Sequence, residues 1–381
     1  MDFDLKEEQS MFRQTVREFA EAEIAPKVEE LDEKGEFPYE LVAKMADLGL
    51  FGLPIPEEYG GSEADFVTYA LSVEEISRVS AALGITMAAH TSLAALAVYY
   101  FGTEEQKQKW LIPLAQGKIL GAFGLTEPEA GSDAGATKTT ARLEGDEWVI
   151  NGTKCFITNS GTDITGMVTL TAVTDNKRDR KEISNVIVPK GTPGFTVAPP
   201  YRKMGWRSSD THELSFDDCR VPEENLLGER GTGFKQFLKL LDCGRIGVAA
   251  LSVGLAQACL DESVKYSKER IQFGQPIGKN QGISFKVADM LVEVELARLG
   301  YLRAAWAADQ GGPYSKEASV AKLFASETAM RAANAAVQIH GGYGYVEDYP
   351  VCRYFRDAKI MEIGEGTSEV QRIVLSRQLG L

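Results

Sequence analysis

Between about Gly121 and Gly233 the sequence changes from helical periodicity to short β-rich runs, and after that stretch it changes back. Before it, apolar residues recur at helical spacing, as Phe12, Val16 and Phe19 do. Within it, short runs rich in Val, Ile, Thr and Phe are separated by Gly, Pro, Asn and Asp, a pattern typical of strands joined by tight turns. The chain is therefore expected to place a β insert between two helical parts.

The limits of these parts follow from where each pattern stops. We expect a mainly α fold with an N-terminal α-helical domain over 1–120, a middle β domain over 121–230 and a C-terminal α-helical bundle over 231–381. Asp4, with Glu7 three residues later, is expected to cap the first helix. The other helices are expected at 40–48, 69–79, 85–101, 104–116, 234–269, 283–308, 316–339 and 367–375. The strands are expected at 148–150, 155–158, 167–173, 186–188, 195–197, 213–216 and 219–221, in an antiparallel barrel or sandwich.

Charge and cysteine content narrow the classes of partner and compartment. A net charge of -14 disfavours nucleic acid and anionic membranes, both of which need a basic face. The five cysteines are scattered and odd in number, and the N-terminal residues do not resemble a targeting peptide. No apolar run approaches the roughly 20 residues of a membrane span. The sequence therefore predicts a cytoplasmic protein with reduced thiols.

Several common chemistries lack their motifs in this sequence. The three histidines, His90, His212 and His340, form no ligand pair such as HExxH, so no metal centre is expected. There is no Walker A motif, no GxGxxG after a strand and no GxSxG elbow. Cys155 has no evident base beside it and is interpreted as a buried structural thiol. The usual hydrolase, kinase and nicotinamide-dependent classes are therefore unsupported.

Two glycine-containing segments admit a binding role and a structural one. The segment 125–135, LTEPEAGSDAG, offers small and hydroxyl residues whose backbone N–H groups can approach an anionic or ring-shaped ligand, but it also fits a well-made turn. The segment 338–345, QIHGGYGY, has three glycines within four residues. Gly341 alone would serve as a helix end. The further glycines indicate close approach of a ligand or a neighbouring subunit, or a structural turn.

A third segment places a carboxylate between two glycines. Glu365 lies between Gly364 and Gly366, just before a helix that Thr367 or Ser368 can cap. A carboxylate on such a hinge can be aimed into a pocket. The alternative interpretation is a first-turn glutamate that only interacts favourably with the helix dipole.

Taken together, the segments resemble the acyl-CoA dehydrogenase family over essentially the whole chain. The matching motifs are LTEPEAGSD (125–133), KCFITN (154–159), KMGWRSSDT (203–211), LDCGRIGVAA (241–250), SKERIQFGQPI (267–277), QIHGGYGY (338–345), RYFRDAKIMEI (353–363) and EGTSEVQR (365–372). The sequence is most similar in pattern to short- and branched-chain bacterial members. The resemblance implies helical, β and four-helix-bundle domains in that order, FAD as cofactor, a homotetramer and an electron-transferring flavoprotein as electron acceptor.

The resemblance also assigns residues to FAD. Those implied to line the flavin ring are Phe123, Leu125, Thr126 and Ser132 on one side and Phe156, Ile157 and Thr158 on the other. Thr367 and Glu369, which follow the base, are implied to contact FAD as well. Those implied to reach the FAD of a neighbouring subunit are Arg270, Phe273, Gln281, Gln338, Gly341 and Gly342.

For the substrate, the resemblance implies that Glu365 removes the α-proton of an acyl-CoA thioester while a β-hydride passes to flavin N5, giving the 2-enoyl-CoA. The coenzyme A arm is assigned to Ser132, Asp242 and Arg245, although Arg245 could instead be a buried ion-pair partner of Asp242. Some members carry the base at the position of Gly244, which cannot serve here. Two other readings of the family pattern are an oxidase that passes electrons to oxygen and a catalytically silent scaffold.

One departure from the family pattern concerns the substrate. Many members have Tyr immediately before the base, where this chain has Gly364. The smaller residue predicts a wider pocket for short, branched or cyclic acyl groups, unless another side chain fills the gap or the change is neutral. Gly364 and Gly366, which flank Glu365, are both expected to contact the substrate.

Overall fold

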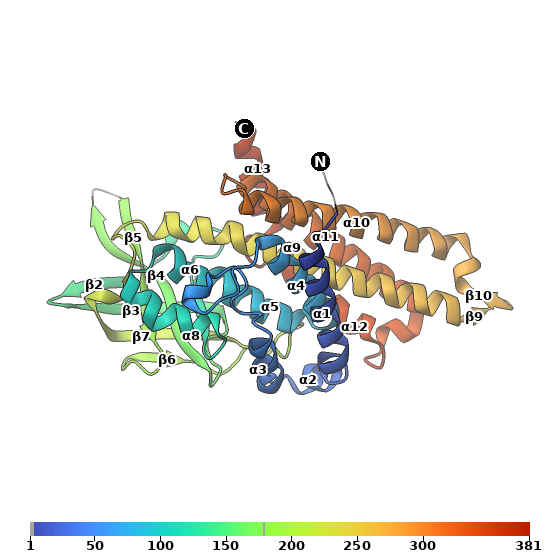
Figure 1. The fold of residues 1–381 in the computed structure, drawn as a ribbon, viewed down its shortest axis with the longest axis horizontal. Helices are drawn as coiled ribbons and strands as arrows, with labels where there is room; N and C mark the ends of the chain where they lie inside the picture. The colour runs from blue at the N-terminus through green and yellow to red at the C-terminus, as the bar shows by residue number, and fades with distance from the viewer. Residues whose placement is uncertain (1–3, 178–179) are drawn as a thin grey trace.

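The computed structural model describes residues 4–177 and 180–381. Figure 1 shows a β-rich unit at one end of an elongated molecule, with long helices running away from it. The helices before the sheet are α1 (Glu7–Phe19), α2 (Val28–Lys34), α3 (Tyr39–Asp47), α4 (Phe66–Val79), α5 (Ala81–Ala89), α6 (Leu96–Phe101), α7 (Glu104–Gln106) and α8 (Ile112–Ala115). The helices after it are α9 (Gly233–Glu269), α10 (Gln281–Asp309), α11 (Ser315–His340), α12 (Pro350–Ala358) and α13 (Ser368–Gln378). The expected order of helical part, β insert and helical bundle is confirmed.

The first helix does not begin as predicted. Lys6, not Asp4, precedes α1, and the Gln9 side chain accepts a hydrogen bond from the Lys6 backbone N–H at 2.9 Å. The same Gln9 side chain donates to Asp65 at 2.8 Å, which ties the start of α1 to the start of α4. A long-range contact therefore fixes the helix start, and local capping signals could not reveal it.

The strands form one eight-stranded sheet in the order β6-β7-β3-β2-β4-β5-β8, with β1 paired to β4. They are β1 (Leu120–Gly124), β2 (Thr140–Glu144), β3 (Glu147–Thr158), β4 (Thr165–Lys177), β5 (Arg180–Pro189), β6 (Phe195–Val197), β7 (Thr211–Pro222) and β8 (Leu226–Leu227). Most neighbours are antiparallel, whereas β1 and β2 each pair with β4 in parallel. Two pairs of expected short strands are single strands here, because β3 and β7 continue through register shifts.

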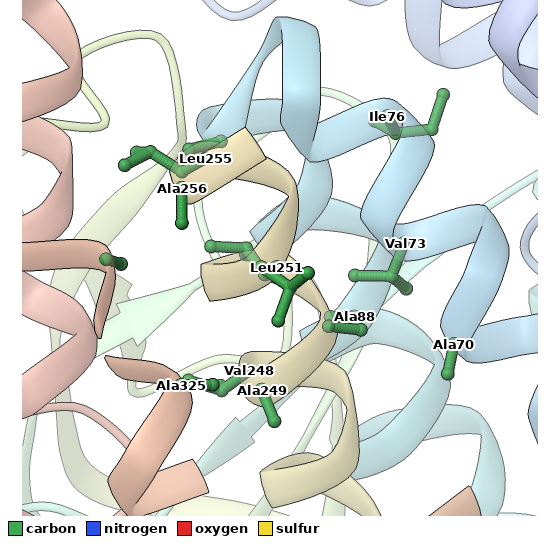
Figure 2. Packing of buried hydrophobic residues seen from close by; sticks show 14 of the residues in the cluster. Ala70, Val73, Ile76, Ala88, Val248, Ala249, Leu251, Leu255, Ala256 and Ala325 are labelled. Carbon is green, nitrogen blue, oxygen red and sulfur yellow. The ribbon is translucent and has the colours of Figure 1, made fainter. Parts of the chain in front are cut away.

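The main core lies where α9 packs between α4 and α11. Figure 2 shows this packing, with Val248, Ala249, Leu251, Leu255 and Ala256 of α9, Ala70, Val73 and Ile76 of α4, Ala88 of α5 and Ala325 of α11. The many alanines let the helices approach closely. The helix α1 is held on this core by Arg13 and Arg17, which bind the fully buried Glu75 at 2.7 and 2.8 Å.

Two helical stretches, 81–101 and α9, are long and apolar enough to cross a membrane by length and composition. The search for unbroken apolar runs in the sequence did not detect them, because polar residues interrupt each run although the mean hydropathy stays high. Of their most apolar windows, 89% and 94% is buried inside the fold. Their apolar character is therefore explained by their place in the core.

Candidate active site

The Glu365 carboxylate is directed at Gly244, in the N-terminal third of α9, by an unusual backbone turn. Glu365 and Gly366 have φ values of 52° and 93°, and a positive φ is uncommon for a residue with a side chain. Thr367 then caps α13 by accepting a hydrogen bond from the Val370 N–H at 3.2 Å. A Cβ atom built on Gly244 would lie 1.9 Å from Glu365 Oε2. The carboxylate therefore lies against the bare backbone of α9.

The surroundings of this carboxylate raise its affinity for a proton above that of an ordinary glutamate. Glu365 Oε2 is inaccessible and has no hydrogen-bond partner among the described residues, although other parts of the residue are half-buried. Burial raises the pKa of Glu365 to about 7, against the opposing effect of the Lys322 and Arg245 charges. A base is most effective when its pKa is close to the working pH.

Beside Gly244, Asp242 and Arg245 form the ion pair that the sequence left open. Arg245 Nη1 lies 2.7 Å from Asp242 Oδ1, and Ser315 donates to the same oxygen at 3.0 Å. Arg245 is almost fully buried, and its Nε has no partner among the residues described. The pairing leaves that N–H free for a ligand, so it does not exclude a role in binding the coenzyme A arm.

The loop after β1 is fastened to β3 by a buried ion pair. Lys154 has no exposed surface, and its Nζ donates to Glu127 Oε1 at 2.7 Å and to the Leu125 carbonyl at 3.0 Å. Burial alone would raise the pKa of Glu127, but the Lys154 charge and several hydrogen bonds hold it at about 2. The Cys155 N–H also donates to the Thr126 carbonyl at 2.7 Å. Thr126 and Leu125 are half-buried, and Ser132 is exposed farther along the loop.

A change of register in β3 brings an aromatic ring to the surface. The pairing of β3 with β7 shifts between Lys154 and Ile157. Phe156, with φ 60°, is therefore 65% exposed and lies beside Tyr201 at a ring separation of 5.1 Å. Ile157 is buried in the core of the sheet, so only its backbone is available to a ligand, whereas Thr158 is half-buried.

The buried Phe123 links the same region to α9. Its ring stacks on Phe237 with centroids 5.9 Å apart. Leu125 and Leu241 pack against the same apolar cluster, which includes Cys243. The structure thus brings the loop after β1 next to the part of α9 that carries Asp242, Gly244 and Arg245.

The remaining predicted cofactor residues lie elsewhere in the chain. Figure 1 places β9 (Ile271–Gln272) and β10 (Gln275–Pro276) at the end of the molecule opposite the sheet. Phe273 is 97% exposed there, and the Arg270 guanidinium lies 5.4 Å from the centre of the Tyr343 ring. The other exposed members of this group are Gln281, Gln338, Gly341 and Gly342. Among the described residues, no hydrogen bond, ion pair or ring contact joins any of them to Glu365.

Three polar residues around the site were not predicted from the sequence. Lys322 and Gln371 hydrogen-bond to the carbonyls of the turn at Glu365 and Gly366, and Lys154 fastens the loop at Leu125. The KCFITN motif contains Lys154, but nothing local marks it as buried. Lys322 lies 44 residues before its hydrogen-bond partner Gly366, so local patterns carry no signal for it.

Three family models match successive parts of the chain. They are described as acyl-CoA dehydrogenase N-terminal, middle and C-terminal domains and match residues 6–118, 122–219 and 231–380. A Bacillus subtilis protein named "Probable acyl-CoA dehydrogenase YngJ" is 57% identical over 380 residues, with 100% of both chains covered. "Acyl-CoA dehydrogenase, short-chain specific" of Clostridium acetobutylicum is 49% identical over 379 residues, again with 100% of both covered.

Solved structures agree with this chain in fold. The butyryl-CoA dehydrogenase of Megasphaera elsdenii has a TM-score of 0.97 and 46% identity, with 100% of both chains covered. A chain from the structural study of the electron transferring flavoprotein of Acidaminococcus fermentans has a TM-score of 0.97 and 50% identity, with 100% of this chain and 99% of that chain covered. A glutaryl-CoA dehydrogenase of Mycobacterium smegmatis in complex with FADH2 has a TM-score of 0.93 and 30% identity, with 98% and 95% covered.

Proposed function

Since the chain belongs to the acyl-CoA dehydrogenase family, we propose that it oxidises a short, branched or cyclic acyl-CoA to the 2-enoyl-CoA, with Glu365 as the base. The observation that carries this proposal is the buried, unpartnered Glu365 Oε2 lying against Gly244. An α-hydrogen next to a thioester is weakly acidic, so its removal needs a base that is ionised yet poorly solvated. Glu365 has both properties at neutral pH.

Enzymes of this family use FAD, and the residues present fit that cofactor. Phe156 offers an exposed aromatic face beside the half-buried Thr126 and Thr158 of the neighbouring segments. At the other group, Cβ atoms built on Gly341 and Gly342 would meet no heavy atom within 4 Å, which leaves room for a ligand to reach the backbone. When bound, FAD supplies the acceptor for the hydride that leaves the β-carbon of the substrate.

The other proposed roles belong to the chain's own groups. The backbone N–H of Glu365 would donate to the thioester carbonyl and stabilise enolate-like charge, as the family resemblance implies. Arg245, Asp242 and Ser132 would hold the coenzyme A arm, so that the α-carbon lies beside the Glu365 carboxylate. In this arrangement the acyl group would exclude water from Glu365 and keep its pKa high.

Assembly and electron acceptor complete the proposal. We propose a homotetramer in the cytoplasm that passes electrons to an electron-transferring flavoprotein. Exposed apolar side chains on α10, including Phe285 at 60%, Leu296 at 53% and Trp306 at 59%, support a covered face. An assembly would also be needed if Arg270 and Phe273 are to reach the FAD of another chain. Peroxide formation in air would instead favour an oxidase.

Anaerobic titration with acyl-CoA thioesters is the experiment that tests this function. We expect the flavin absorbance of the purified protein to bleach with butyryl-CoA and with isobutyryl-, 2-methylbutyryl- or cyclohexanecarbonyl-CoA. The branched and cyclic groups are included because a Cβ atom built on Gly364 would meet only the Ile360 carbonyl oxygen, at 3.4 Å, within 4 Å. Apart from its two chain neighbours, no side chain among the described residues lies within 4 Å of that Cβ position.

The matched variant for this titration is Gly364→Tyr. Its ring should narrow the pocket and lower the rate with branched and cyclic thioesters relative to butyryl-CoA, by roughly tenfold or more for a misfit of a few methyl groups. Bleaching with straight chains alone in the wild-type protein would contradict the wide pocket. Absence of bleaching with every thioester would contradict the proposed function.

The pH dependence of turnover follows from the same carboxylate. Because Glu365 must be ionised to accept a proton and its pKa is raised to about 7, kcat/KM should fall as the pH falls below about 7. Below that pKa the ionised fraction drops roughly tenfold for each pH unit. Steady-state rates with butyryl-CoA between about pH 5 and pH 9 would measure this fall of kcat/KM on the acidic side of the profile. A rate that stays constant down to about pH 5 would contradict a base with a raised pKa, because a glutamate with the ordinary pKa near 4.3 would still be mostly ionised there.

A further inference from the structure

The turn that carries Glu365 is held by one cationic and one neutral side chain. Lys322 on α11 donates from Nζ to the Gly366 carbonyl at 2.7 Å. Gln371 on α13 donates from Nε2 to the same carbonyl at 3.0 Å and to the Glu365 carbonyl at 3.3 Å. Lys322 and Gln371 have no exposed surface. Two buried donors therefore fix the unusual backbone of Glu365 and Gly366.

The Lys322 ammonium is a buried charge without a close carboxylate. Among residues 4–177 and 180–381, no carboxylate oxygen lies within 4.0 Å of the Lys322 Nζ atom. Burial lowers the pKa of Lys322 to about 8, and the charge that opposes this most is that of Glu365, ahead of Glu362 and Glu369. A neutral donor could satisfy the Gly366 carbonyl without the cost of burying a charge. The hydrogen bond alone does not explain why a lysine is present.

The other charged and titratable groups near Glu365 are compensated or neutral. Arg245, from α9, is paired with Asp242 at 2.7 Å. Tyr69, from α4, is fully buried, and burial followed by the Glu365 charge raises its pKa far above neutrality, so it carries no charge. Lys322, from α11, is thus the cation near Glu365 that lacks a carboxylate partner of its own among the described residues.

We propose that Lys322 is a positioning residue for the base: its ammonium group fixes the Glu365–Gly366 turn and places a positive charge behind the Glu365 carboxylate. This inference rests on the proposed role of Glu365. Burial opposes the ionised form of Glu365, and Lys322 is the first of the charges that favour it. The lysine thereby keeps a dry carboxylate ionised enough to act at neutral pH, which a neutral donor in its place would not do.

The test separates proton removal from hydride transfer. Methylthioacetyl-CoA has an acidic α-hydrogen but sulfur in place of the β-carbon, so it has no β-hydride to give. The holoenzyme is incubated with this thioester in deuterated buffer between about pH 5 and pH 9, and mass spectrometry measures deuterium incorporation at the α-carbon. Wild type, Lys322→Met and Gln371→Leu are compared, because Gln371→Leu removes a donor to the same turn without removing a charge.

In Lys322→Met the acidic limb of the exchange profile, where the rate falls with falling pH, should move to higher pH. At about pH 6 its exchange rate, normalised to its own plateau, should be roughly tenfold below that of wild type, since loss of a charge at short range moves a carboxyl pKa by about one pH unit or more. Gln371→Leu should lower the maximal exchange rate at high pH, but its rate should begin to fall at the same pH as in the wild type. Lys322→Arg, which keeps the charge, should restore the wild-type limb even if its plateau is lower.

Each alternative result has a distinct meaning. An unchanged limb in Lys322→Met, or an equal movement in Gln371→Leu, would overturn the role of the charge. Absence of exchange in the wild type would overturn the proposed base and this inference with it. Flavin absorbance and thermal denaturation report whether each variant is folded and loaded. If Lys322→Met does not retain flavin, Lys322→Gln provides the neutral side chain, with the same two outcomes.

Discussion

Replacing Glu365 by Gln is expected to lower the rate of flavin bleaching by acyl-CoA roughly 10²- to 10⁴-fold, the range that a general base contributes. The amide has nearly the shape of the carboxylate, so the turn at Glu365 and Gly366 and the contact with Gly244 should persist. The loss should therefore fall on kcat, with little change in the affinity for the thioester. Anaerobic stopped-flow absorbance with butyryl-CoA measures both.

The thermal stability of Glu365→Gln is a second measurement, and it should not fall although the activity does. Because burial raises the pKa of Glu365 from 4.5 to about 7, the ionised form costs stability once the pH exceeds the unfolded value of about 4.3. Removing the charge should therefore leave the thermal midpoint at pH 8 unchanged or higher. A variant that is inactive because it is misfolded would instead show a lower midpoint and lost flavin.

A nearby carboxylate supplies the matched control for Glu365→Gln. Glu362, three residues earlier, is half-buried and pairs with Lys359 at 2.6 Å on the surface. Glu362→Gln removes the same charge from the same segment and should bleach at close to the wild-type rate. If Glu365→Gln bleached as fast as Glu362→Gln, Glu365 would not be the base.

The geometry also explains how related sequences could carry the base at the position of Gly244 and not at that of Glu365. Glu365 reaches α9 from the C-terminal turn, and its Oε2 occupies the space that a Cβ atom on Gly244 would need. A carboxylate growing from that helix position would therefore enter the same space. Glycine at 244 and glutamate at 365 are therefore sterically linked. The sequence pattern indicated this pairing but not its steric reason.

The order of helices and strands could be predicted from the sequence because each part follows its own periodicity. Element limits were less predictable. The expected strands 148–150 and 155–158 are one strand, β3, because a register shift keeps the pairing through the intervening residues. A second shift, between Lys154 and Ile157, brings Phe156 to the surface and leaves Ile157 in the core. A two-residue alternation read from the sequence cannot locate such a shift.

The supporting residues of the site were the hardest to predict. Glu365 was noticed because two glycines flank it, whereas Lys322 lies in an ordinary-looking helix and Lys154 in an ordinary-looking strand. A lysine in such a place is usually solvated. Its burial depends on contacts with residues far along the chain, and only the folded chain shows them.

Replacing Lys154 by Met is expected to destabilise the protein by about 3–5 kcal/mol and to release FAD, because it leaves the Glu127 carboxylate buried and unpaired. Glu127 Oε1 lies 2.7 Å from Lys154 Nζ, and Glu127 also accepts hydrogen bonds from the Lys138 and Thr139 N–H groups at 2.6 and 3.1 Å. Loss of the cation should therefore loosen the whole loop after β1. Urea denaturation followed by flavin fluorescence measures the unfolding free energy and the release together.

The double variant Glu127→Gln, Lys154→Met separates the ion pair from the packing. If the cost comes from an unpaired buried charge, removing both charges should recover a large part of the stability lost in Lys154→Met. Lys181→Met is the control for a lysine at the same loop: its Nζ donates to the Ala136 and Thr137 carbonyls at 3.0 and 2.9 Å, but from an exposed position. It should cost about 1 kcal/mol or less. Equal losses in Lys154→Met and the double variant would instead attribute the effect to the lysine's hydrogen bonds and packing, because the unpaired carboxylate would then contribute nothing.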